Sequence, residues 1–219
     1  MCMASDNTQR MISLLGAMRK QMNGAVANTM RYYGADYGLN YGVSLPTIRS
    51  IAQAEERNHQ LALYLYKQQV RELRLAALHI ADPTLLTPDS LDVWAEGIIN
   101  SEVAEEMAFA LLRYADSLPK IFAEWASSDN ELLAYAALRS AAATAFGREV
   151  EVVAQTIEAV DRFHSSRIIA QAAVAVLAAA YEHNPEARHA VEQAISGLND
   201  SLSASYVKEE MAWRMELVQ

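Results

Sequence analysis

Residues 168–181 decide the fold class, because they read IIAQAAVAVLAAAY and are almost entirely apolar. Alanine loses no side-chain entropy in a helix, so the run has a high helix propensity. The polar Gln171 and the short length of the run argue against a membrane span. The stretch therefore predicts a helix buried inside an all-α protein.

Similar small-residue helices recur on both sides of this stretch. They are RLAAL at 74–78, EMAFA at 106–110, AYAAL at 134–138, AQAAV at 170–174 and EMAWR at 210–214. Their central alanines are separated by 32, 28, 36 and 40 residues, a spacing typical of HEAT-like helix pairs. Because an isolated pair cannot cover its apolar face, pairs stack side by side. The sequence predicts an α-solenoid of about six antiparallel HEAT-like pairs with one concave surface; the alternative is an irregular helical bundle.

Turn and capping residues divide the chain into helices. Ser44 and Pro46 begin one helix, Thr87 followed by Pro88 begins another, and Asn184-Pro185 ends a third. No linker of altered composition interrupts the pattern, so we expect one domain over 1–219. The predicted helices are 7–22, 25–33, 46–56, 59–68, 70–81, 88–99, 101–115, 118–127, 130–146, 149–162, 165–183, 186–197 and 204–217.

The composition limits the possible partners. The chain has 219 residues, 52% hydrophobic side chains and a net charge of −9, which weighs against nucleic-acid binding without excluding a local basic groove. A single cysteine, Cys2, excludes an intrachain disulfide and fits a reducing compartment. With no secretory signal or membrane span in the sequence, we expect a cytoplasmic protein with no membrane partner. The five histidines show no ligand spacing, so neither a metal nor a cofactor is expected.

Four segments in order resemble one known family. They are GVSLPTIRSIA at 42–52, WASSDN at 125–130, AVLAAAYEHNPE at 175–186 and the Ser- and Glu-containing segment at 203–212. Together they cover most of the chain and resemble the AlkD-like DNA alkylation repair proteins. The resemblance implies a HEAT-like solenoid related to glycosylases that remove alkylated bases from DNA.

The resemblance does not extend to the family's catalytic groups. Active relatives hold the damaged nucleotide with two tryptophans, a carboxylate and an arginine that grips phosphate. In the simplest register the first tryptophan and the carboxylate are replaced by Val103 and Met107, and the arginine-bearing segment by residues 132–135. The later tryptophan and a nearby arginine fall at Ala175 and Ala178. A shift of register would supply Glu105 or Glu106 as the carboxylate, but no tryptophan.

Candidate binding residues remain. If they face the concave surface, Arg71, Arg74, Arg139 and Arg167 are placed to contact phosphates, and Tyr135 and Trp125 to stack on bases. The alternative is that the arginines form salt bridges and the aromatics fill the core. The segment 32–42, YYGADYGLNYG, either binds a partner or anchors the first helices.

Three functions stay open on the sequence. The first is a catalytically degenerate family member that binds DNA or a partner on its concave face. The second is an active glycosylase with relocated catalytic groups, and the third is a protein-interaction scaffold. We favour the first, and therefore lean against an enzyme.

Overall fold

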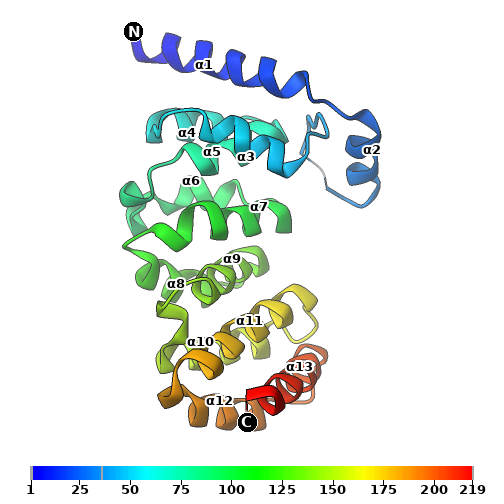
Figure 1. Cartoon of the computed structure of the whole chain (residues 1–219), viewed down its shortest axis with the longest axis vertical. Coiled ribbons are helices and arrows are strands. Elements are labelled where there is room, and N and C mark those ends of the chain that lie inside the picture. The colour runs from blue at the N-terminus through cyan, green and yellow to red at the C-terminus, as the bar shows by residue number, and fades with distance from the viewer. Residues whose placement is uncertain (1, 36, 219) are drawn as a thin grey trace. The chain divides into compact units, whose positions relative to one another are not determined.

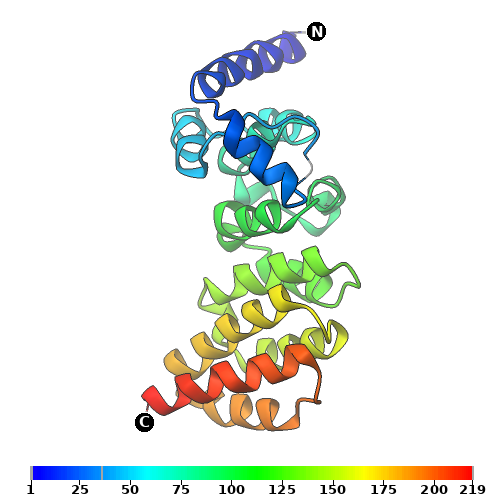
Figure 2. The same cartoon turned by 90° about the vertical axis from the view of Figure 1, so that its right-hand side faces the viewer.

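The structure is a computed structural model that describes residues 2–35 and 37–218, and these residues are helical almost throughout (Figures 1 and 2). In this part of the chain the strand-like pairing is limited to an isolated bridge between Leu39 and Val70. The all-α prediction is confirmed. The chain forms two compact units, residues 1–106 and 107–219, which are described separately. The expectation of a single domain over 1–219 stays a prediction.

The first unit consists of short helices around α5. Helix α5 (Arg71–Ile80) contacts α1 (Cys2–Arg19), α3 (Leu45–Gln53), α4 (His59–Tyr66) and α7 (Ser101–Glu106). Its residues are buried almost without exception, including both arginines. The unit also contains α2 (Gly24–Tyr32), α6 (Leu91–Glu96) and 3-10 turns at Pro83–Leu85 and Pro88–Ser90. Helix α5 is therefore the core of this unit.

The second unit is organised around α11 (Arg167–His183), which contains the alanine-rich run at 168–181. It contacts α9 (Glu131–Ala142), α10 (Val150–Arg162), α12 (Arg188–Gly197) and α13 (Leu202–Val218), while α8 (Leu118–Ala126) packs on α9. Four alanines on α11, Ala170, Ala172, Ala173 and Ala180, are fully buried and allow its neighbours to approach closely. Short 3-10 turns lie at Leu112–Tyr114, Phe146–Arg148 and Pro185–Ala187.

The predicted cap at Ser44 is confirmed, and other helices begin with similar side-chain caps. The side chains of Ser44, Asn130 and Ser166 accept hydrogen bonds from the first turns of α3, α9 and α11. Pro46 lies in the first turn of α3, where its missing N–H costs nothing. Local side chains thus explain where these helices begin.

Two predicted helices differ most from the expectation. The helix expected at 88–99 is regular only in α6, because the Tyr66 hydroxyl donates to the Trp94 carbonyl at 2.9 Å and Gly97 packs against the Tyr66 ring. The helix expected at 101–115 is α-helical only in α7, then widens to a π-turn at Met107–Leu111 and tightens to a 3-10 turn. Both departures follow from tertiary packing and backbone geometry that periodicity does not encode.

Candidate functional site

Helix α7 carries the carboxylates that the family resemblance brings into question. Glu106 is 2% exposed and binds two basic side chains. Arg49 on α3 makes a bidentate ion pair, with its Nε 3.1 Å from Oε2 and its Nη2 on Oε1. The Nε2 of His79 on α5 lies 2.8 Å from Oε2. Three helices therefore converge on one buried carboxylate.

These contacts fix the charge of Glu106. Burial alone would raise the pKa of this carboxyl, but hydrogen bonds from His79 and Arg49 outweigh it and lower the pKa to about 2. The Arg49 pKa is raised, chiefly by its hydrogen bond to Glu106. Glu106 is ionised at neutral pH with both oxygens engaged, so its charge is already balanced within the protein.

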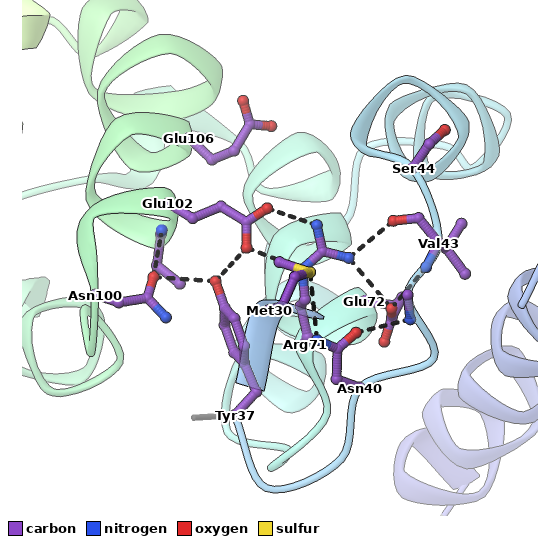
Figure 3. Close-up of polar contacts among 12 residues, drawn as sticks. Met30, Tyr37, Asn40, Val43, Ser44, Arg71, Glu72, Asn100, Glu102 and Glu106 are labelled. Carbon is purple, nitrogen blue, oxygen red and sulfur yellow. Dashed lines mark hydrogen bonds and ion pairs between the residues drawn. The ribbon is translucent and has the colours of Figure 1, made fainter. Parts of the chain in front are cut away.

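Glu102, one turn earlier, is bound by a second arginine (Figure 3). The Arg71 side chain places Nη2 2.5 Å from Oε1 and Nε 2.9 Å from Oε2. The Tyr37 hydroxyl also donates to Oε2 at 2.5 Å and lies 3.0 Å from the Asn100 amide oxygen. Burial and the Glu102 charge raise the Tyr37 pKa, so the phenol stays protonated and donates.

The remaining donors of Arg71 face the chain between α2 and α3. Its Nη1 donates to the Val43 carbonyl at 2.8 Å and lies 3.3 Å from the Glu72 carboxylate. Glu72 is fully buried and accepts the backbone N–H groups of Tyr41 and Val43 at 3.1 and 3.2 Å. This cluster of Tyr37, Arg71, Glu72 and Glu102 fastens the Gly- and Tyr-rich segment to α5 and α7.

The second unit has an open groove between α9, α11 and α13. Its volume is about 420 Å³. Two arginines, two glutamates and a histidine give it a mixed polar lining. The lining residues are Arg139, Gln171, Val174, Ala175, Ala178, Ala179, Glu182, His183, Tyr206, Glu210 and Arg214. Ala175 and Ala178, the positions at which the sequence register expects the family's tryptophan and arginine, thus line this groove.

The positions aligned with the other catalytic groups are buried. Val103 and Met107 have no exposed surface, and Tyr135 is 7% exposed. Side chains packed in this way fill the core of their own unit. In the expected register, the positions of an aromatic and a carboxylate are therefore occupied by buried apolar side chains, and the register itself stays a prediction.

The predicted binding residues are not gathered into one site. Arg71 and Arg74 are 3% and 9% exposed in the first unit, and Arg74 lies over the Tyr66 ring at 5.9 Å. Trp125 is 2% exposed in the second unit, so for Arg71 and Trp125 the structure supports the alternative of ion pairing and core packing.

Two predicted arginines remain at the surface of the second unit. Arg139 lines the groove and lies 5.0 Å from the Phe109 ring centroid. Arg167 is exposed at the start of α11, beside a smaller hollow that Ser203 and Tyr206 also line. Of the predicted set, only Arg139 belongs to the groove.

Sequence reasoning missed Arg49 and His79 as partners of Glu106. Arg49 stands in the GVSLPTIRSIA segment, but its partner lies 57 residues further on. Within residues 2–35 and 37–218, no group of three His, Cys, Asp or Glu side chains is arranged to hold a metal ion. Among the same residues, no helix has the length and apolar character needed to cross a bilayer.

These features define an α-helical repeat protein of the HEAT-like class. A solved structure described as "a new family of proteins related to the HEAT-like repeat DNA glycosylases with affinity for branched DNA structures" matches with a TM-score of 0.71. The match covers 94% of this chain and 95% of the other at 16% sequence identity. The fold is therefore the predicted α-solenoid fold.

The family follows from the sequence match. A family model described as "DNA alkylation repair enzyme" matches residues 14–209, and the chain belongs to this DNA alkylation repair family. No curated protein matches. The suspected family is confirmed.

Proposed function

We propose that the chain is a DNA-binding member of the alkylation repair family that prefers branched DNA and does not excise bases. The observation that carries the proposal is the state of Glu106. Base excision needs a carboxylate that faces the developing positive charge of the departing nucleotide. Glu106 faces Arg49 and His79 instead, and its charge is balanced by the Arg49 guanidinium.

Two further features support the loss of excision. The Glu102 carboxylate is held by Arg71 and Tyr37, so it is engaged in the same way as Glu106. In the groove of the second unit, Ala175 and Ala178 replace a tryptophan and an arginine. An alanine offers neither an aromatic face for a cationic base nor a donor for a phosphate.

The DNA part of the proposal rests on the family and on the similar solved structure. That structure represents proteins with affinity for branched DNA. A solenoid that has lost its excision groups keeps the helices and surface charges with which it contacts DNA backbone. We therefore infer that binding outlasted catalysis in this chain.

Base release is the test of the catalytic half. The protein, in excess over duplex DNA carrying 7-methylguanine or 3-methyladenine, is incubated beside an active relative. We expect release equal to the protein-free control. Release above that control that disappears in Glu105→Gln or Glu106→Gln would instead establish a glycosylase with relocated groups.

Binding is tested separately on forked, three-way and plain duplex DNA of equal length. We expect tighter binding to the branched forms and an affinity that falls steeply as salt rises, because bound phosphates release counterions. Affinity that is indifferent to salt, or absent on every DNA, would contradict the proposal. Recovery of a protein partner after nuclease treatment would then favour the scaffold function.

A further inference from the structure

The N-terminal helices are basic although the chain as a whole is acidic. Residues 7–54 contain five basic side chains, Arg10, Arg19, Lys20, Arg31 and Arg49, and only one acidic residue. The net charge of the whole chain is −9, so the rest of the chain is strongly acidic. Such a local excess of positive charge is the electrostatic property expected of a surface that contacts phosphates.

Three of these basic side chains are available to an external anion. Arg10 is paired with Glu55 and Arg49 with Glu106. Arg19, Lys20 and Arg31 are exposed, and the described part of the chain offers them no ion pair. Arg19 is the last residue of α1 and Lys20 follows it, and Arg31 lies in the last turn of α2. The available positive charge therefore lies around α2.

The same helix ends in two exposed aromatic side chains. Tyr32 and Tyr33 are 84% and 80% exposed, and their ring centroids lie 5.2 Å apart in an edge-to-face arrangement. Aromatic side chains that are this exposed bury almost none of their apolar surface on folding. They bury it only when another flat group stacks on them. Two more exposed apolar side chains lie in this region: Val26 on α2, 41% exposed, and Met22 just before the helix, 60% exposed.

Helix α2 is mostly exposed to solvent, and backbone contacts hold its N-terminal end to the unit. Ala27 is its buried residue, whereas the other described side chains of the helix are exposed or half-buried. The Asn23 N–H, directly before the helix, donates to the Tyr41 carbonyl at 2.8 Å. The Tyr41 N–H in turn donates to Glu72, whose carboxylate is paired with Arg71 (Figure 3), so a buried ion pair supports the residue that binds the start of α2.

Gly42 makes this attachment possible. Its φ of 69° is in the left-handed region, and a Cβ there would lie 2.1 Å from the Asn23 carbonyl oxygen. The loop therefore lies directly against the first turn of α2. The tyrosine pair at the other end of the helix is held in a defined place and yet is uncovered.

A cleft between α1 and α3 continues the basic surface. It has a volume of about 590 Å³ and is lined by Lys20 together with the hydroxyl-bearing Thr47 and Ser50. An ammonium group and two hydroxyls are the contacts that proteins commonly make to DNA phosphates. The cleft is thus suited to the backbone of a strand whose bases reach α2.

We propose that the exposed Tyr32–Tyr33 pair on α2, with Arg19, Lys20 and Arg31, is a stacking site for unpaired bases at the branch point of DNA. The inference rests on the proposed function and names the part of branched DNA that the protein recognises. Bases inside a duplex have both faces covered, whereas unpaired bases expose theirs to aromatic side chains. Positive side chains beside the rings hold the phosphates of the same strand.

The test uses a synthetic forked DNA with 2-aminopurine at the first unpaired position, and a fully paired duplex of the same sequence. Stacking of 2-aminopurine on a tyrosine quenches its fluorescence. The variants are Tyr32→Ala/Tyr33→Ala and Tyr32→Phe/Tyr33→Phe. The matched control is Tyr114→Ala, which removes an exposed tyrosine from the second unit.

Wild-type protein is expected to quench the probe. Because stacking of one base is worth about 1–3 kcal/mol, the double alanine variant should bind forked DNA on the order of 5- to 150-fold more weakly. It should lose the quenching while its affinity for the duplex is unchanged. The double phenylalanine variant should behave as wild type, because it keeps the aromatic rings at positions 32 and 33. Tyr114→Ala should also behave as wild type, because it leaves this pair unchanged.

The charge half of the proposal has its own pair of variants. The double variant Lys20→Gln/Arg31→Gln should reduce the slope of log affinity against log salt concentration by about 2, one for each lost phosphate contact. Lys120→Gln, at an exposed position of the second unit, should leave the slope unchanged. Equal forked-DNA affinity and quenching in wild type and the double alanine variant would overturn the inference alone. Wild-type protein that binds no DNA would overturn the proposed function with it.

Discussion

The ion pairs of Glu106 allow a quantitative prediction for the free energy of unfolding of the first unit. In Glu106→Gln the carboxylate is replaced by a neutral amide of nearly the same shape, so Arg49 and His79 lose their charged partner. The folded-state pKa of about 2 lies below the ordinary value of 4.5. That difference corresponds to about 3 kcal/mol of stability at neutral pH.

Some of this loss is recovered by solvent. The Arg49 side chain is 42% exposed, so water can solvate its guanidinium once the carboxylate is gone. His79 is 10% exposed and gains less. We therefore expect Glu106→Gln to lower the free energy of unfolding by about 2–3 kcal/mol at pH 7, somewhat less than the loss of a fully buried pair, because Arg49 is partly exposed.

The pH dependence gives the prediction its sign. Because the folded-state pKa is depressed, the stabilisation is complete above pH 4.5 and is lost as the pH falls towards about 2. The difference between wild type and Glu106→Gln, measured by urea unfolding with circular dichroism, should therefore shrink through this window. The exposed Glu124→Gln is the control and should change stability by less than about 0.5 kcal/mol. An equal stability of wild type and Glu106→Gln at pH 7 would refute the reasoning.

Three further substitutions probe other parts of the structure. Gly42→Ala forces a Cβ against the Asn23 carbonyl at positive φ, so we expect α2 to be cleaved more readily in limited proteolysis. Gly34→Ala is the control and should have a smaller effect, because a Cβ there meets open space. Arg71→Ala leaves Glu72 buried without its ion-pair partner and should cost about 3–5 kcal/mol in urea unfolding. Trp125→Ala removes a buried ring and should cost about 3–5 kcal/mol, whereas a change at the 69% exposed Trp213 should be near neutral.

Local sequence was sufficient for the fold class. The alanine-rich run at 168–181 is buried in α11 as expected, because helix propensity and apolar periodicity are properties of neighbouring residues. The helix starts at Ser44 and Asn130 were predictable for the same reason, since a capping side chain acts within three residues. Helix ends set by distant groups, such as the Tyr66 ring beside Gly97, were not predictable.

The candidate site was harder because its contacts are non-local. Glu106 and His79 are separated by 27 residues and Arg49 and Glu106 by 57, and no local pattern states that they meet. For the Gly- and Tyr-rich segment, the sequence left open whether it binds a partner or anchors the first helices. In the structure Tyr37 is buried and acts as an anchor, whereas Tyr32 and Tyr33 are exposed. A loop has no regular period, so the sequence alone does not assign its side chains to the inside or the outside.

The way in which α2 is fastened has a consequence for how this family can diversify. Its hold on the unit is made mainly by backbone groups and by Gly42, while most of its described side chains are exposed. Mutations along the outer side of this helix therefore change what it meets without a folding penalty. An exchange of this helix that keeps Gly42 and Glu72 would therefore leave its attachment in place while its binding preference changes, much as antibodies vary loops on a constant frame.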